Sequence, residues 1–60
     1  MTKIRVYILP KGYKDFICDT VTIEPVLGGH QATVNGGKHD GEIIKNSYGA
    51  RVIKENVDEE

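Results

Sequence analysis

The sequence has few of the residues that staple or anchor a small protein. Its 60 residues include one cysteine, Cys18, and no tryptophan, and the apolar run Val6-Tyr7-Ile8-Leu9 is only four residues long. A lone cysteine excludes an internal disulfide and fits a reducing compartment. A signal-peptide core needs roughly 7–15 apolar residues and a membrane span about 20. We therefore expect a cytoplasmic protein that makes no contact with membranes.

The sequence also lacks an excess of basic charge. Eight basic and nine acidic side chains give a formal net charge of −1. Domains that bind nucleic acid by neutralising phosphates usually show a clear basic excess. The charges are unevenly distributed, however, because residues 1–14 contain four cations and no acid. One face of the protein is therefore expected to be basic.

What the chain does contain is a series of short β patterns. Residues 3–9 alternate between apolar and polar side chains, as in a half-buried strand. Residues 16–24 form the second candidate, which either carries a bulge near Cys18-Asp19 or begins at Thr20 after an irregular segment. Further strands are predicted at 31–34, 42–45 and 50–54. The loop after Asn35 is either tight or runs to Gly41, and we favour the longer form.

The end of the chain is less sharply defined. The turn residues 46–49 predict a hairpin in which Ile44 and Val52 face each other. Residues 50–57 also fit a helical spacing, and this alternative stays open beside the strand that we favour. We assign residues 1–57 to a single small β domain and residues 58–60 to an acidic, frayed tail.

These elements predict an all-β fold, with four to five strands in an antiparallel meander, a curled sheet or an SH3-like barrel. A chain of 60 residues buries only about 60% of its unfolded surface. If the sheet stays open, we expect its first strand to pair with a second copy, which would give a homodimer through an edge strand. The predicted core consists of Ile4, Val6, Ile8, Ile17, Val21, Ile23, Val34, Ile44 and Val52.

One segment resembles a known group of small barrels. Residues Ala32-Thr33-Val34, Gly37 and Gly41-Glu42-Ile43 are similar to the pattern of KOW-type and other SH3-like barrels, in which a short strand and a glycine-containing loop precede Gly-x-(Val/Ile). The resemblance covers roughly a quarter of the chain, and the spacing of the second glycine departs from the family pattern. It implies a fold and no function, because folds of this kind host many functions.

The glycine-rich centre holds the side chains with the most chemical potential, but not in a recognisable pattern. Cys18, His30, His39 and Asp40 contain no close pair of the kind that zinc sites use. A Cys–His nucleophile would need an enclosed pocket that a thin sheet rarely forms. Residues 36–38 do not match the phosphate-binding loop, which requires G-x-x-x-x-G-K-[ST] before a helix. We therefore predict no metal site, no cofactor and no enzymatic activity.

The aromatic and basic residues give the better functional hypothesis. Arg5 and Tyr7 lie in the solvent-facing row of the first predicted strand, and Tyr and Arg are enriched in protein interfaces. We predict a binding surface on Arg5, Tyr7, Tyr13 and Tyr48, with Lys38 and His39 of the 35–41 loop at its rim.

The predicted function is that of a non-enzymatic β protein that binds another protein as a regulator or inhibitor, a role that would fit a phage or prophage protein. The alternative is a small β-barrel module that binds nucleic acid, stacking bases on aromatic rings within a basic groove.

Overall fold

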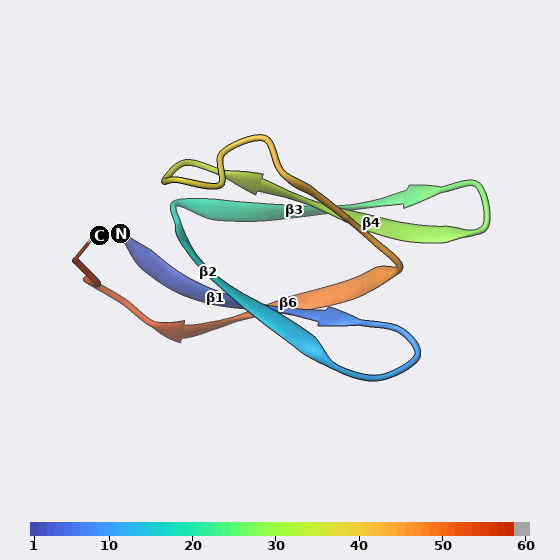
Figure 1. Ribbon diagram of the computed structural model, residues 1–60, viewed down its shortest axis with the longest axis horizontal. Coiled ribbons are helices and arrows are strands. Elements are labelled where there is room, and N and C mark those ends of the chain that lie inside the picture. Colours follow the sequence, from blue (N-terminus) through green and yellow to red (C-terminus); the bar gives the residue numbers. More distant parts are fainter. Residues whose placement is uncertain (59–60) are drawn as a thin grey trace.

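The computed structural model describes residues 1–58, which form six strands and no helix (Figure 1). The strands make two three-stranded antiparallel sheets, which we call sheet A, with the order β2-β1-β6, and sheet B, with the order β3-β4-β5. The predicted all-β class is confirmed. The pairings within residues 1–58 leave the two sheets separate and do not close a barrel. The strands are β1 (Thr2–Ile8), β2 (Tyr13–Cys18), β3 (Thr20–Val26), β4 (Gly29–Asn35), β5 (Ile43–Lys45) and β6 (Ser47–Lys54).

The chain crosses between the two sheets twice, as the two layers in Figure 1 show. The first crossing is at Asp19, whose N–H donates to the carbonyl of Asn35 at 2.9 Å. The second is at Asn46, which has a left-handed φ of 60° and accepts a hydrogen bond from the N–H of Leu9. Ser47 follows, fully buried, and its hydroxyl donates to the carbonyl of Ile44. Both corners are thus fixed by hydrogen bonds to other parts of the chain.

The expectation of one strand over residues 16–24 is wrong, because the segment divides at Asp19 into two strands of different sheets. Phe16 and Cys18 point into the core before the break, and Val21 and Ile23 point inward after it. The inward row therefore changes parity at Asp19, as a bulge there would produce. An irregular segment before Thr20 is excluded, because β2 occupies it. The chain accordingly has six strands instead of four or five.

The predicted hairpin at residues 46–49 is also wrong. β5 and β6 lie in different sheets, so Ile44 is opposite Ala32, and Val52 is opposite Ile4. The chain does change direction near residues 46–49, as the turn residues predict. The local sequence, however, carried no information about which strands would pair. Residues 47–54 are a strand, which excludes the helical alternative there.

The two ends of the described chain meet, as Figure 1 shows. Met1 and Val57 exchange two backbone hydrogen bonds, of 3.1 and 2.7 Å. Of the predicted acidic tail, Asp58 is exposed, and residues 59–60 lie outside the described residues. Because β1 pairs with β2 on one side and with β6 on the other, it is the central strand of sheet A. The expectation that the first strand offers a free edge to a second copy is therefore wrong.

The core lies between the two sheets and agrees with most of the predicted positions. Ile17 is an exception, because it points outward from β2, and Val52 is another, because it is 53% exposed. Burial raises the pKa of the Cys18 thiol, and the nearby Asp19 carboxylate adds to the effect. The buried apolar residues are Ile4, Val6, Phe16, Cys18, Ala32, Val34 and Ile44, and Ile8, Val21 and Ile23 pack against them.

The long form of the loop between β4 and β5 is confirmed, since β4 ends at Asn35 and β5 begins at Ile43. Gly37 sits against β2 with a φ of 75°, and a Cβ there would collide with the carbonyl oxygen of Ile17. The N–H of Gly36 donates to the carboxylate of Asp40 at 2.7 Å. Glycine is needed here because the loop approaches the backbone of β2 closely in a left-handed conformation.

Candidate functional site

The outer face of sheet A carries the candidate site. In β1, the side chains that alternate with the buried Ile4 and Val6 point away from the core. The strand register then places side chains of β2 and β6 beside them on the same face. We call this surface the A face. The outward row of β1 and the strand register place on it Lys3, Arg5, Tyr7, Tyr13, Asp15, the half-buried Ile17, Arg51 and Lys54, and Tyr48 joins them from β6 through its contact with Tyr7.

Three tyrosines gather at one end of the A face. Tyr13 lies opposite Tyr7 in the pairing of β1 with β2, and the ring of Tyr48 lies 6.2 Å from that of Tyr7, tilted by 33°. Tyr48 is the extra residue where the register of β6 shifts against β1, between the partners of Tyr7 and Ile8. Such a bulge re-aims a side chain. Tyr13 and Tyr48 each remain 55% exposed, so much of this aromatic surface faces solvent.

Arg5 is held in place beside the tyrosines. Its Nε donates to Oδ1 of Asp15 at 2.9 Å, and a terminal nitrogen donates to Oδ2 at 3.2 Å. The guanidinium lies 4.0 Å from the ring centroid of Tyr13, within the range of a cation–π contact. The hydrogen bond raises the pKa of Arg5 and lowers that of Asp15, the latter against a smaller opposing effect of burial. The side chain of Arg5 is therefore held in one orientation by Asp15 and Tyr13.

Cations also lie opposite cations on the A face. The register pairs Arg5 with Arg51 and Lys3 with Lys54. Like charges in directly opposed positions destabilise a sheet. Within residues 1–58, Arg5 is the one member of this group that forms an ion pair, and Asp15 is its partner. The A face thus carries four cations and one carboxylate, and the like charges are expected to act against the pairing of β1 with β6.

Lys38 and His39 lie on a different part of the surface. The ring of His39 meets that of Phe16 edge to face at 5.3 Å, and its Nδ1 is 3.1 Å from Oε1 of Glu42. Their loop contacts β2 near Ile17, four residues or about 13 Å along the strand from Tyr13. The structure therefore brings together four of the six predicted residues, Arg5, Tyr7, Tyr13 and Tyr48, and places Lys38 and His39 apart from them.

Sequence reasoning missed Asp15 as the partner of Arg5. A signal was present, because a hairpin centred on Pro10 pairs Tyr7 with Tyr13 and Arg5 with Asp15. The position of Arg51 beside Arg5 could not be predicted from the local sequence, because it depends on the pairing of the first strand with the last.

The potential metal ligands of the glycine-rich centre are dispersed. Cys18 is buried in the core, His30 lies near the start of β4, and His39 lies in the loop beside Phe16. Within residues 1–58, no three His, Cys, Asp or Glu side chains form a group that could hold a metal ion.

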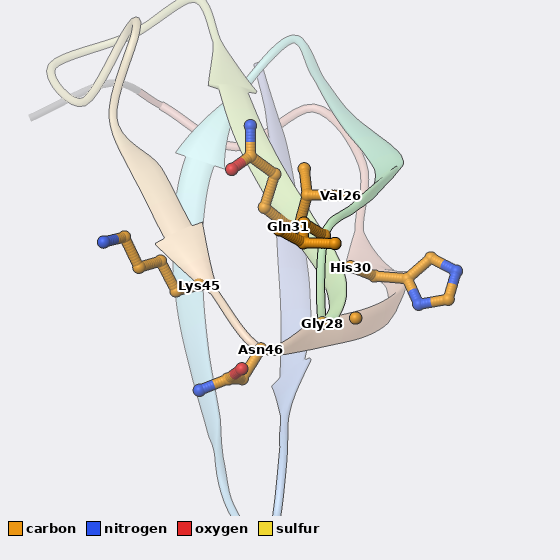
Figure 2. A pocket seen from close by; sticks show the side chains of 8 residues that line it. Val26, Gly28, His30, Gln31, Lys45 and Asn46 are labelled. Atoms are coloured by element: carbon orange, nitrogen blue, oxygen red, sulfur yellow. The ribbon is translucent and has the colours of Figure 1, made fainter.

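A small pocket of about 200 Å³ lies where the β3–β4 turn meets the corner between β5 and β6 (Figure 2). Its volume is below the roughly 300 Å³ at which ligand pockets usually begin. In Figure 2 the ring of His30 points away from Gln31 and Lys45, so the pocket does not gather its polar side chains around one point. It is lined by Val26, Leu27, Gly28, Gly29, His30, Gln31, Lys45 and Asn46.

A scan against protein-family models, a search of curated proteins and a search of solved structures each found no match. In the described part of the chain, no helix is long and apolar enough to pass through a bilayer. The case for function therefore rests on the A face itself.

Proposed function

We propose that this chain is a non-enzymatic binding protein that regulates or inhibits another protein by contact through the A face. The observation that carries the proposal is the clustering of Tyr7, Tyr13 and Tyr48 around an anchored Arg5. Tyrosine and arginine dominate the energetic centres of protein interfaces. None of these rings belongs to the buried core, and Tyr13 and Tyr48 remain exposed even though cross-strand aromatic contacts add to the stability of the sheet.

The remaining chemistry of the chain supports contact over catalysis. The most nucleophilic candidate, Cys18, is fully buried and its pKa is raised, so little of it is thiolate at neutral pH. Within residues 1–58, neither histidine forms a hydrogen bond with Cys18: His30 lies near the β3–β4 turn, and the ring of His39 contacts Phe16 and Glu42. A general base must lie within hydrogen-bond reach of the group that it activates.

Nucleic-acid binding is the second candidate, and the opposed cations of the A face favour it. Two features argue for a protein partner. The charge of Arg5 is already paired with Asp15, and one face of the Tyr13 ring is covered by the guanidinium of Arg5. A base-stacking platform needs open aromatic faces. The affinity of a nucleic acid would also fall steeply with salt, with a slope near −0.7 per phosphate contact on single strands.

The test is capture of the partner from cells that make the chain, with and without nuclease treatment. We expect nuclease-resistant capture of a protein. In the purified pair, Tyr7→Ala or Tyr48→Ala should weaken binding by about 2 kcal/mol or more, roughly thirtyfold in Kd. The matched controls, Thr22→Ala and Lys45→Ala on the other sheet, should bind like the parent chain. Unchanged binding by folded tyrosine variants, or capture that nuclease abolishes, would contradict the proposal.

A further inference from the structure

The second half of β6, residues 50–54, lies at the edge of sheet A. It has one free backbone edge, and its side chains are exposed on both faces of the sheet. Within residues 1–58, β1 is its one strand partner, so its other edge is free. All five side chains from Ala50 to Lys54 are exposed. Val52 lies in the row that faces the core, opposite the buried Ile4, and is nevertheless 53% exposed. A free edge with unpaired backbone groups is a template for the addition of another strand.

An apolar groove runs along the inner side of this edge. It has a volume of about 250 Å³ and lies between the start of β3 and the second half of β6. Its apolar lining is formed by Ile4, Val21, Ala50 and Val52, and Asp19, Thr20 and Arg51 complete it. Asp19 lies on the β3 side of the groove, so an entering side chain there must be apolar and not acidic. A strand that paired with β6 would place every second side chain toward this groove, because side chains alternate across a strand.

The outer side of the same edge is basic. Arg51 and Lys54 belong to the A face, where they lie opposite Arg5 and Lys3. Within the described residues, neither Arg51 nor Lys54 forms an ion pair. The side chains of an added strand that do not enter the groove would point to this side and would meet these cations.

We propose that an extended segment of the partner protein, with alternating acidic and apolar residues, adds to the free edge of β6 as a strand. Its apolar side chains fill the groove, and its backbone pairs with residues 50–52, before the register of β6 shifts at Ile53. Its carboxylates contact Arg51 and Lys54, which share the outer side because of that shift. This is strand addition, in which backbone hydrogen bonds give affinity and alternate side-chain sites give specificity. The inference rests on the proposed protein-binding function and identifies the chemistry of the partner segment.

A second copy of this chain fits the edge less well. Pairing of two β6 strands would bring Arg51 and Lys54 of one copy near the same cations of the other, and like charges on an edge act against such pairing. A nucleic acid offers anionic groups for the outer side but no alternating apolar side chains for the groove. The charge of one side and the apolar character of the other therefore select an acidic, amphipathic strand.

The test uses a fluorescently labelled peptide of four Glu-Val repeats, with its ends blocked, and measures fluorescence anisotropy against the full chain. Comparison probes are a Lys-Val peptide of the same length, a peptide with the same composition in two blocks, and an eight-nucleotide deoxythymidine strand. We expect saturable binding of the Glu-Val peptide alone, weakened by added salt. Stronger binding of the oligonucleotide, or equal binding of the block peptide, overturns the proposal.

Variants of the chain separate the two sides of the edge. The double variant Arg51→Gln/Lys54→Gln should weaken binding of the peptide by about twofold to thirtyfold, as expected for the loss of two exposed ion pairs. Its control is Lys38→Gln/Lys45→Gln, which changes the net charge equally at distant sites. Val52→Lys, at an exposed position, should weaken binding by placing a charge in the groove. Equal affinities across these variants would contradict the inference.

Two further measurements test the binding mode. Methylation of alternate peptide nitrogens blocks one edge of the peptide, so one of the two alternate patterns should abolish binding and the other should not; equal behaviour of both would rule out strand addition. The mass of the chain in solution should be that of a monomer. If the parent chain is a dimer and Val52→Lys dissociates it, a second copy of the chain occupies the edge of β6, which would contradict the proposal. If the peptide does not bind, but binding of the native partner still depends on Tyr7, this inference is wrong and the proposed function stands.

Discussion

The outer faces of the two sheets both belong to three antiparallel strands but differ in their chemistry. The outer face of sheet B carries mainly polar side chains, two pairs of which form hydrogen bonds across strands, together with Lys45 and the exposed Ile43. Asn35 donates to the hydroxyl of Thr22 at 3.0 Å, and Gln31 donates to Glu24 at 3.2 Å. The A face carries large aromatic rings and cations, with Arg51 opposite Arg5.

The difference shows which face the fold explains. Cross-strand pairs of polar or opposite-charge side chains stabilise a sheet, and like charges destabilise it. Sheet B therefore has the outer face of a sheet adapted to water. On the A face the aromatic contacts and the Arg5–Asp15 pair also stabilise the sheet, but Tyr13 and Tyr48 stay largely exposed and cations lie opposite cations. We propose that a partner covers this exposed surface.

The largest expected effect contrasts the two faces of strand β2. Phe16→Ala removes a ring that is 5% exposed and should lower the free energy of unfolding by about 3–5 kcal/mol. For a chain of this size, that loss is expected to unfold much of the population. Tyr13→Ala, on the outer side of the same strand, should leave the chain folded. Thermal unfolding followed by circular dichroism compares them, and a similar loss in both variants would show that the tyrosines serve the fold.

A smaller effect is expected from the polar network of sheet B. Asn35→Ala removes the hydrogen bond to Thr22 and should lower the free energy of unfolding by about 0.5–1.5 kcal/mol. Binding of the partner should not change. Chemical denaturation gives the first quantity and titration calorimetry the second. Weakened binding in the folded variant would mean that sheet B also contributes to recognition.

These contrasts also show what the sequence could reveal. The alternation in residues 3–9 is enough to find β1 and to place Arg5 and Tyr7 on its outer side. The change of parity near Cys18-Asp19 was visible in the sequence and suggested a bulge. What the sequence did not show is that the two halves of residues 16–24 join different sheets.

The arrangement of the site depends on contacts far apart in the sequence. Tyr48 and Arg51 reach the A face because the last strand pairs with the first, and no local turn signal specifies that pairing. The same pairing explains why Val52 is not core, since its side chain lies at an open edge instead of inside a hairpin. Lys38 and His39 were assigned to the rim from loop position alone, which could not predict the packing of His39 on Phe16.

Reversing the charge of Arg51 tests whether the opposed cations destabilise the A face. Arg51→Glu would replace a like-charge pair with an opposite-charge pair beside Arg5 and should raise the unfolding midpoint slightly. It should also weaken binding of the partner, so that stability and binding change in opposite directions. The control, Lys45→Glu on sheet B, should not separate the two quantities in this way. If Arg51→Glu lowers the unfolding midpoint, Arg51 does not destabilise the fold, and its presence needs no explanation from binding.

The smallest effect concerns the pH dependence of Asp15. Its pKa is lowered in the folded chain by the hydrogen bond from Arg5, so the pair stabilises the fold above the ordinary value of 3.8. This contribution is lost as the pH falls through the lowered pKa. Unfolding midpoints measured from pH 7 to pH 2 should therefore fall further for the parent chain than for Asp15→Asn, and the other carboxylates cancel in the comparison. Parallel curves would show that the ion pair is absent in solution.

The central claim is that a protein partner covers the outer face of sheet A and leaves that of sheet B exposed. The most direct test is an NMR titration of the isotope-labelled chain with the captured partner, which reports on both faces in one experiment. We expect the largest changes at Tyr7, Tyr13, Tyr48 and Arg51, and little change at Thr22 and Thr33. Changes concentrated on Thr22 and Thr33, or spread evenly over both sheets, would contradict the account.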